Sequence, residues 1–245
     1  MELDNASGKK RVTGKTRDLV ISLDRGILAF ARHWLLAFNL FVFFYVGLPF
    51  LAPVLENAGL SGPARVIYVT YSPLCHQLGY RSLFLFGERV TYPRDVFQDY
   101  TGINPNDLLG ARAFVGNARM GYKVALCERD VAIYGAILLG GMIFGLPFVR
   151  RRLKPLHWLG WILVGLAPIA LDGFSQLFSN FPYNTLPLLN LLPQRESTLF
   201  LRTLTGGLFG LANMWLAYPY VEESMRSVSE ELETKLARVD ADVAS

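Results

Sequence analysis

The sequence predicts an all-α membrane protein: a four-span helical bundle with an extracytoplasmic interfacial arm, a small cap and a C-terminal amphipathic helix. Of the 245 residues, 52% are hydrophobic and 18% are charged, whereas soluble domains carry roughly a quarter charged residues. Four apolar stretches are long enough to cross a bilayer. The basic residues gather beside these stretches, and that asymmetry is what orients a membrane protein.

The first 33 residues form a polar, basic leader, in which a short surface helix is expected over residues 19–31. Its basic side chains are Lys9, Lys10, Arg11, Lys15, Arg17, Arg25 and Arg32. Residues 34–55 then contain no charged side chain and are long enough to span. This stretch is too long and too aromatic for a cleaved secretory signal, so we interpret it as a retained first span.

Three further spans are predicted, over residues 131–149, 156–178 and 198–221. The link between the second and third spans is strongly basic, with Arg150, Arg151, Arg152 and Lys154, whereas the link over residues 179–197 contains only Arg195. Basic residues of short links stay on the cytoplasmic side. We therefore expect a multi-pass protein of the cell membrane with both termini in the cytoplasm.

Residues 56–130 are predicted to form an extracytoplasmic insert. Its segment 64–86 is long enough to span, but it contains His76 and Arg81, and a polar group at mid-bilayer costs several kcal/mol. We interpret this segment as an interfacial or re-entrant arm. The following residues carry helix-start signals at 91–95 and 104–107, where a capping residue precedes a proline, and predict a small folded cap.

The C-terminal tail, residues 222–245, has apolar residues at spacings of three and four, which is typical of an amphipathic helix. These residues are Met225, Val228, Leu232, Leu236 and Val239. Two interpretations remain open for this helix. It either frays in water or lies back on the protein, or it docks on a protein partner in a larger complex.

A first group of candidate site residues surrounds two cysteines. On a helix, Cys127, Asp130 and Tyr134 would share one face, and the predicted topology brings Cys75 and His76 to the same membrane level. Two thiolates, an imidazole and a carboxylate form a ligand set suited to zinc or iron. Two alternatives remain: a Cys75–Cys127 disulfide, if the outside is oxidising, or a pair of inert buried thiols.

A second group lies in the outer turns of the third and fourth spans. Asp172 and Gln176 are four residues apart, and Arg202 lies near the start of the fourth span. Charges that face lipid are expensive, so an Asp172–Arg202 pair is expected, with Asp130 or Glu196 as further partners of the arginine. The pair would belong to a polar membrane site or would simply fix how the helices dock.

Four motifs in order connect these groups. They are Cys75-His76-Gln77 with Arg81-Ser82, Cys127 through Tyr134, Asp172-Gly173 with Gln176, and Arg202 with Thr205-Gly206. Over roughly residues 65–215 the chain resembles an integral-membrane family catalogued as domain of unknown function 2085. Many members carry a second cysteine where Asp130 stands here. The carboxylate is a harder metal ligand than a thiolate, so this site is less rich in thiolate than theirs. The resemblance implies a shared site at the extracytoplasmic leaflet and no particular reaction.

The sequence contains no hydrolase, kinase or nucleotide-binding motif. It has no basic stripe with interleaved aromatic residues, so nucleic acid is not an expected partner. The first functional hypothesis is a membrane protein with a polar Cys/His/Asp/Arg site that binds metal or is redox-active. The alternative is a non-catalytic accessory subunit with a structural Cys75–Cys127 disulfide. Whether the protein is an enzyme stays open, and four short spans without an inverted repeat argue against a transporter.

Overall fold

The computed structural model describes residues 14–179 and 195–244. The chain divides into two compact units, one formed by Met1–Phe38 with Pro219–Ser245 and a larger one formed by Asn39–Tyr218. The expectations for residues 1–13 and for most of the link between the third and fourth spans lie outside the described residues.

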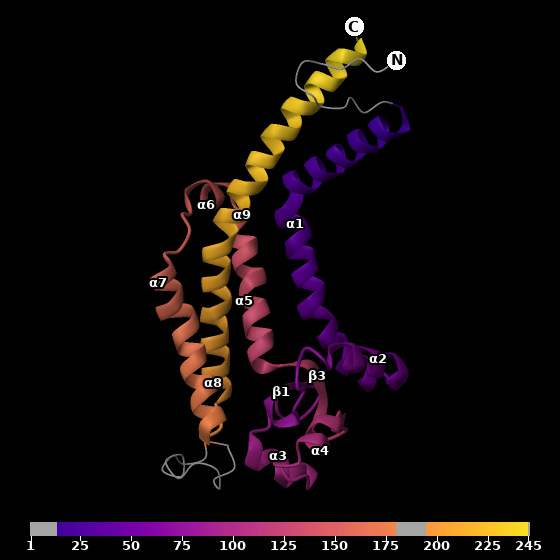
Figure 1. The fold of residues 1–245 in the computed structure, drawn as a ribbon. Coiled ribbons are helices and arrows are strands. Elements are labelled where there is room, and N and C mark those ends of the chain that lie inside the picture. The colour runs from indigo at the N-terminus through magenta and orange to yellow at the C-terminus, as the bar shows by residue number, and fades with distance from the viewer. Residues whose placement is uncertain (1–13, 180–194, 245) are drawn as a thin grey trace. The chain divides into compact units, whose positions relative to one another are not determined.

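The smaller unit is a pair of helical segments, the beginning of α1 (Lys15–Asn57) and the end of α9 (Leu199–Ala244), which run side by side (Figure 1). Three ion pairs join them: Arg25–Asp240 at 3.2 Å, Arg32–Glu233 at 3.0 Å and Asp24–Lys235 at 2.6 Å. The amphipathic tail is therefore a helix that lies on the chain's own first helix. Its docking on a separate protein stays a prediction.

Helix α1 changes direction at the predicted boundary between leader and first span. The backbone of His33 is non-helical, with φ −117° and ψ 15°, although the helix continues on both sides. The expected surface helix over residues 19–31 therefore exists, and it is continuous with the first apolar stretch. Pro49 and Pro53 lie inside the second part of α1, where each removes one backbone hydrogen bond.

In the larger unit, α5 (Glu128–Phe144) packs closely against α9. A Cβ atom built on Gly206 would lie 2.9 Å from the carbonyl oxygen of Arg129, and one on Gly210 would lie 2.3 Å from that of Ile133. These approaches are closer than any side chain tolerates, so the two glycines let the helices touch along their backbones. After α5, a short α6 (Pro147–Arg152) leads into a composite helix.

The composite helix comprises α7 (Trp158–Gly160), a π-helical turn η2 (Trp161–Leu166) and α8 (Ala167–Ser179). The composite helix is long and apolar enough to cross a membrane, and so is the stretch Lys15–Asn57. These two stretches correspond to the first and third predicted spans. The second and fourth spans lie in α5 and α9, and the complete four-span arrangement remains a prediction.

The insert is a folded cap that mixes helices with a sheet (Figure 1). Its elements are α2 (Ser61–Tyr71), η1 (Gly79–Arg81), β1 (Ser82–Leu85), α3 (Arg94–Thr101), α4 (Leu108–Ala113), β2 (Gly116–Asn117) and β3 (Gly121–Cys127). The strands form an antiparallel sheet in the order β1-β3-β2. The all-α prediction is therefore wrong in the cap. Strand β3 is buried on almost every position, so it lacks the alternation that marks a strand in a sequence.

The structure describes both the predicted arm over residues 64–86 and the two predicted helix starts in the cap. The segment 64–86 is not one helix, because α2 ends at Tyr71 and a strand begins at Ser82. A helix follows each start signal, but the residue before the proline caps neither. Helix α3 begins directly after Pro93 and has no side-chain cap, and α4 begins after Asp107, whose side chain accepts a hydrogen bond from the Gly110 amide at 3.0 Å. The cap has its own core, built around Phe84, Tyr92, Phe97 and Met120.

Candidate functional site

Cys75 and His76 lie in the loop after α2, and the side chain of Gln77 anchors this loop to the cap by hydrogen bonds. Gln77 is buried and has φ +51°, a left-handed conformation that costs a non-glycine residue free energy. Its side-chain amide donates to the carbonyl oxygens of Tyr68 at 2.9 Å and Ala125 at 3.1 Å. These bonds stabilise the strained turn and fix the two residues before it against strand β3.

Lys123 supports the same loop from inside the cap. Its ammonium donates to the carbonyl oxygens of Gln77 at 2.8 Å and Arg112 at 2.6 Å. The side chain is 1% exposed, and among the described residues it forms no ion pair with a carboxylate. Burial lowers the pKa of Lys123 to about 7, because an ammonium is poorly solvated in the cap interior.

The two cysteines meet where β3 passes directly into α5. The amide of Cys127 donates to the sulfur of Cys75 at 3.2 Å, and the Cys127 sulfur lies 3.1 Å from a carboxylate oxygen of Asp130. The two cysteines lie 3.8 Å apart and both are free thiols. Their predicted proximity is confirmed, whereas the disulfide of the alternative hypothesis is not formed in this structure.

The two thiols differ in their readiness to ionise. Hydrogen bonds from Cys127 and from the Gln77 amide lower the pKa of Cys75, because donors stabilise a thiolate. The interaction with the Cys75 sulfur, together with burial, raises the pKa of Cys127. Cys75 therefore ionises more readily than Cys127.

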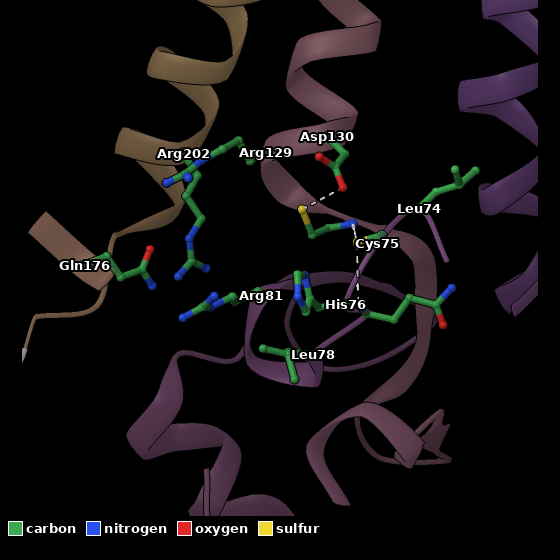
Figure 2. Close-up of a pocket in the computed structure, with 11 residues that line it drawn as sticks. Leu74, Cys75, His76, Leu78, Arg81, Arg129, Asp130, Gln176 and Arg202 are labelled. Atoms are coloured by element: carbon green, nitrogen blue, oxygen red, sulfur yellow. Dashed lines mark hydrogen bonds between the residues drawn. The ribbon is translucent and has the colours of Figure 1, made fainter. Parts of the chain in front are cut away.

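A cavity of about 300 Å³ opens over these sulfurs. Its polar lining consists of Cys75, His76, Gln77, Arg81, Cys127, Arg129, Asp130, Gln176 and Arg202. In the view of Figure 2, Arg81, Arg202 and Gln176 lie on one side of His76, and Cys75 and Asp130 lie on the other. The cavity thus has a thiol and carboxylate side and a guanidinium side.

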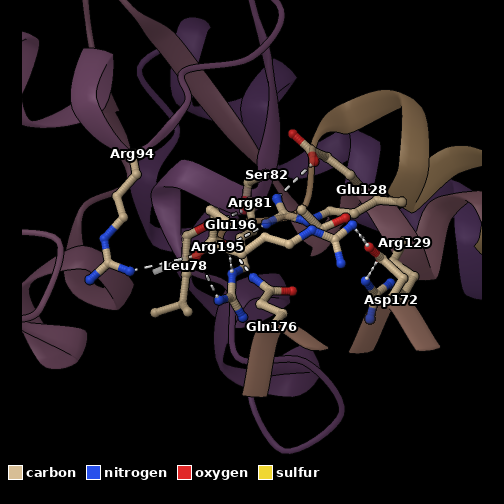
Figure 3. A network of polar contacts seen from close by, with 12 residues as sticks. Leu78, Arg81, Ser82, Arg94, Glu128, Arg129, Asp172, Gln176, Arg195 and Glu196 are labelled. Atoms are coloured by element: carbon tan, nitrogen blue, oxygen red, sulfur yellow. Dashed lines mark hydrogen bonds and ion pairs between the residues drawn. The ribbon is translucent and has the colours of Figure 1, made fainter. Parts of the chain in front are cut away.

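Arg202 joins Glu128 and Glu196, two carboxylates of the ionic network shown in Figure 3. Its guanidinium contacts Glu128 at 3.1 Å and also pairs with Glu196. Glu196 in turn accepts from Arg81 at 2.8 and 3.2 Å, lies 3.6 Å from Arg94 and accepts from the amide of Gln176. The expected sharing of Arg202 by Glu196 is confirmed, and sharing by Asp130 is not seen.

Asp172 belongs to a separate branch of this network. Its carboxylate pairs with Arg129 at 2.5 Å and Arg195 at 3.0 Å, and it accepts from the Ser197 hydroxyl at 2.7 Å. The predicted Asp172–Arg202 pair is therefore wrong. Arg129 and Arg195 satisfy the carboxylate of Asp172, and Glu128 and Glu196 satisfy Arg202.

Six of the eight predicted site residues line the cavity, and two do not. Asp172 reaches it only through Arg129, while the ring of Tyr134 packs on Tyr45 with centroids 4.5 Å apart. The sulfur and oxygen atoms of Cys75, Cys127 and Asp130 lie within 4.8 Å of one another. His76 lines the same cavity but is outside this group of three, so the expected four-ligand set is incomplete.

The important residues that sequence reasoning missed are Glu128, Arg129 and Arg81. Arg129 and Arg81 belong to the motifs that carry the family resemblance, and that was the one available signal. Glu128, Arg129 and Asp130 are consecutive on α5, about 100° apart around the helix axis. Each therefore meets a different neighbour: Glu128 meets α9, Arg129 meets α8, and Asp130 meets the sulfurs.

Comparisons with known proteins agree with this picture. Residues 116–216 match the family DUF2085, described as a predicted membrane protein. The resemblance is thereby confirmed for the three later motifs, whereas Cys75-His76-Gln77 precedes the DUF2085 match. An uncharacterized protein of Methanocaldococcus jannaschii is 25% identical over 196 residues, which cover 77% of this chain and 92% of the relative. No solved structure matches the chain significantly.

Proposed function

We propose that this chain is a multi-pass membrane protein that binds zinc or iron(II) through Cys75, Cys127 and Asp130. The observation that carries the proposal is the spacing of the donor atoms. Zn–S bonds of 2.3 Å in a tetrahedral site separate two sulfurs by about 3.8 Å, which equals the distance between the two cysteines. The Asp130 oxygen lies 3.1 Å from the Cys127 sulfur, and all three donor atoms lie within 4.8 Å of one another, whereas sulfur and oxygen ligands of a tetrahedral zinc site are about 3.5 Å apart.

Three protein ligands leave a fourth position open toward the cavity. Structural zinc sites are closed by four side chains, whereas sites that act on a substrate keep one position for water or ligand. His76 lines the same cavity, and its side chain is exposed. It is therefore available as a fourth ligand or as an acid–base group beside a bound molecule.

A second function uses the same thiols without a metal. The Cys75 thiolate would attack a small-molecule disulfide and release one thiolate from it, leaving a mixed disulfide on Cys75. Cys127 would then lose its proton and displace the second thiolate, which forms the Cys75–Cys127 bond and passes two electrons to the small molecule. The short distance between the cysteines and the lowered pKa of Cys75 favour this reaction.

The proposal places both termini in the cytoplasm and the cavity at the opposite, extracytoplasmic leaflet. It rests on the basic residues of the leader and of the link 150–154, which favour the cytoplasmic side. Four spans would then lie in α1, α5, the composite helix that ends in α8, and α9. Lipid surrounds these helices.

The deciding experiment measures metal content and reactive thiols in the full chain purified in mild detergent. Metal binding predicts about one equivalent of zinc or iron per chain, and two thiols that react with a thiol reagent only after chelation. Cys75→Ser and Asp130→Asn should lower the bound metal, while Asp95→Asn, an exposed carboxylate of the cap, should not. Metal-free protein with thiols exposed only by a reductant would favour the redox function. Metal content unchanged by Cys75→Ser would contradict the proposed ligands.

A further inference from the structure

The guanidinium side of the cavity carries more positive charge than its carboxylates neutralise. The ion pairs around it join five arginines, namely Arg81, Arg94, Arg129, Arg195 and Arg202, to three carboxylates, Glu128, Asp172 and Glu196. The excess is two positive charges. Asp130 lines the cavity but contacts the Cys127 sulfur rather than an arginine, and counting it reduces the excess to one.

The link that leads from α8 to Arg195 adds no negative charge to this site. Residues 180–194, which connect α8 to Arg195, contain no aspartate or glutamate. Net charge held in a partly buried site is costly unless a counter-ion reaches it. Arg202 is almost fully buried, with 5% of its side chain exposed, and Arg129 is 21% exposed. Arg81, Arg94 and Arg195 are 31%, 23% and 41% exposed, so water compensates the excess only in part.

One arginine donor is also unused. The Nε atom of Arg129 is buried, and no described group accepts a hydrogen bond from it, although its Nη2 pairs with Asp172. A buried donor without an acceptor costs roughly 1–3 kcal/mol. Arg129 lines the cavity, so a bound anion with several oxygens would satisfy this donor.

We propose that this cavity binds a phosphate group, held by Arg81, Arg129 and Arg202 with help from the amide of Gln176. Three guanidinium groups come from three elements, η1, α5 and α9, and line the cavity. Each has five N–H donors and uses only one or two of its nitrogens on Glu128, Asp172 or Glu196, so donors remain for phosphate oxygens. A phosphate monoester or diester carries the one or two negative charges that the site lacks. The cavity volume of about 300 Å³ is at the lower end of small-molecule sites and is suited to a headgroup.

This inference rests on the proposed function and names the class of its substrate. The phosphate side and the sulfur side face one cavity, with His76 between them in Figure 2. A phosphate bound by the arginines would therefore lie beside the metal or thiol group. Its source is either the headgroup of a phospholipid or a soluble phosphate compound, and the two sources differ in which probe binds.

The test uses the full chain in nonionic detergent and follows thermal unfolding. One arm titrates inorganic phosphate against potassium chloride of equal ionic strength, and the other compares short-chain phosphatidic acid with the diacylglycerol of the same chains. A ligand of the folded state raises the unfolding temperature in a saturable way. Saturation in either arm supports the site and identifies the source.

The variants locate the binding. Arg81→Gln and Arg129→Gln should each weaken the bound probe about tenfold, which corresponds to about 1.4 kcal/mol. Arg129→Lys keeps the charge beside Asp172 but loses the guanidinium donors, so it should fold and still bind less tightly than the unaltered chain. Arg119→Gln removes an arginine of the exposed Arg119–Glu88 pair in the cap and should leave binding unchanged.

Failure has clear forms. No saturable stabilisation in either arm, binding in Arg129→Lys equal to that of the unaltered chain, or an equal loss in Arg119→Gln would overturn the phosphate site. Each titration is run on zinc-loaded and on chelated protein. If the chain binds phosphate but takes up no zinc when zinc is supplied, the metal proposal fails and the phosphate site stands. If it binds zinc but phosphate has no effect, the phosphate site fails and the metal proposal stands.

Discussion

Replacing Arg202 with methionine should strongly destabilise the protein, and the loss should depend on Glu128. The Arg202 side chain is 5% exposed and that of Glu128 is 3% exposed, at a distance of 3.1 Å. Removing one member of a buried ion pair leaves the other charge without compensation and costs about 3–5 kcal/mol. In a chain of this length, a loss of that size lowers the unfolding temperature by about 6–20 °C.

The assay is thermal unfolding in detergent, followed by tryptophan fluorescence and arranged as two double-mutant cycles. Glu128→Gln combined with Arg202→Met should recover much of the loss, because no buried charge then lacks a partner. Asp172→Asn combined with Arg202→Met should be nearly additive, since Asp172 pairs with Arg129 and Arg195 instead. A larger coupling of Arg202 with Asp172 than with Glu128 would refute the pairing.

Three other predictions concern the cap, the helix contacts and the topology. The pKa of Lys123 is about 7 in the folded chain and about 10.4 in the unfolded chain. Between these two pH values the unfolded chain binds more protons, so the free energy of unfolding rises with pH. Lys123→Met should flatten that rise, measured from urea unfolding curves at several pH values. Gly210→Ala, which places a methyl group against a backbone carbonyl, should cost about 1–3 kcal/mol, whereas Gly207→Ala, with open space around it, should not lower the unfolding temperature. Reporter fusions at Gly102 and Pro155 should report opposite sides of the membrane, and one common side would exclude the four-span arrangement.

The features predicted well from the sequence depend only on hydropathy and residue spacing, which can be read along the chain without knowing how the helices face one another. Hydropathy located the apolar stretches of α1 and of the composite helix, and spacing located the amphipathic tail. The two cysteines were predicted to meet because both fall at the same end of a span. Their contact needed only the depth of each residue in the membrane.

The ion pairs were mispredicted because depth does not determine rotation. Asp172, Arg202 and Asp130 were all expected near the outer ends of their spans, but the partner of each depends on which way its helix faces. Glu128 fell within the predicted insert and was not given a partner, yet it is the first residue of α5 and is buried. The sheet was missed for a related reason: β1 has four residues and β2 has two, which are too few to show a period.

Strand β3 ends at Cys127 and α5 begins at the next residue, so no hinge separates the cap from the second predicted span. Strand β1 pairs with β3 from Ser82 to Leu85, which ties the Cys75 loop to the same strand. The chain between Leu85 and Gly116 leaves this strand and returns to it, so a change of length there would not by itself move the Cys75 loop relative to the Cys127 helix. The DUF2085 match begins at residue 116, at the far edge of that stretch. A search for distant relatives would do best to score the Cys75 loop and the Cys127 helix as two fixed blocks with a gap of variable length between them.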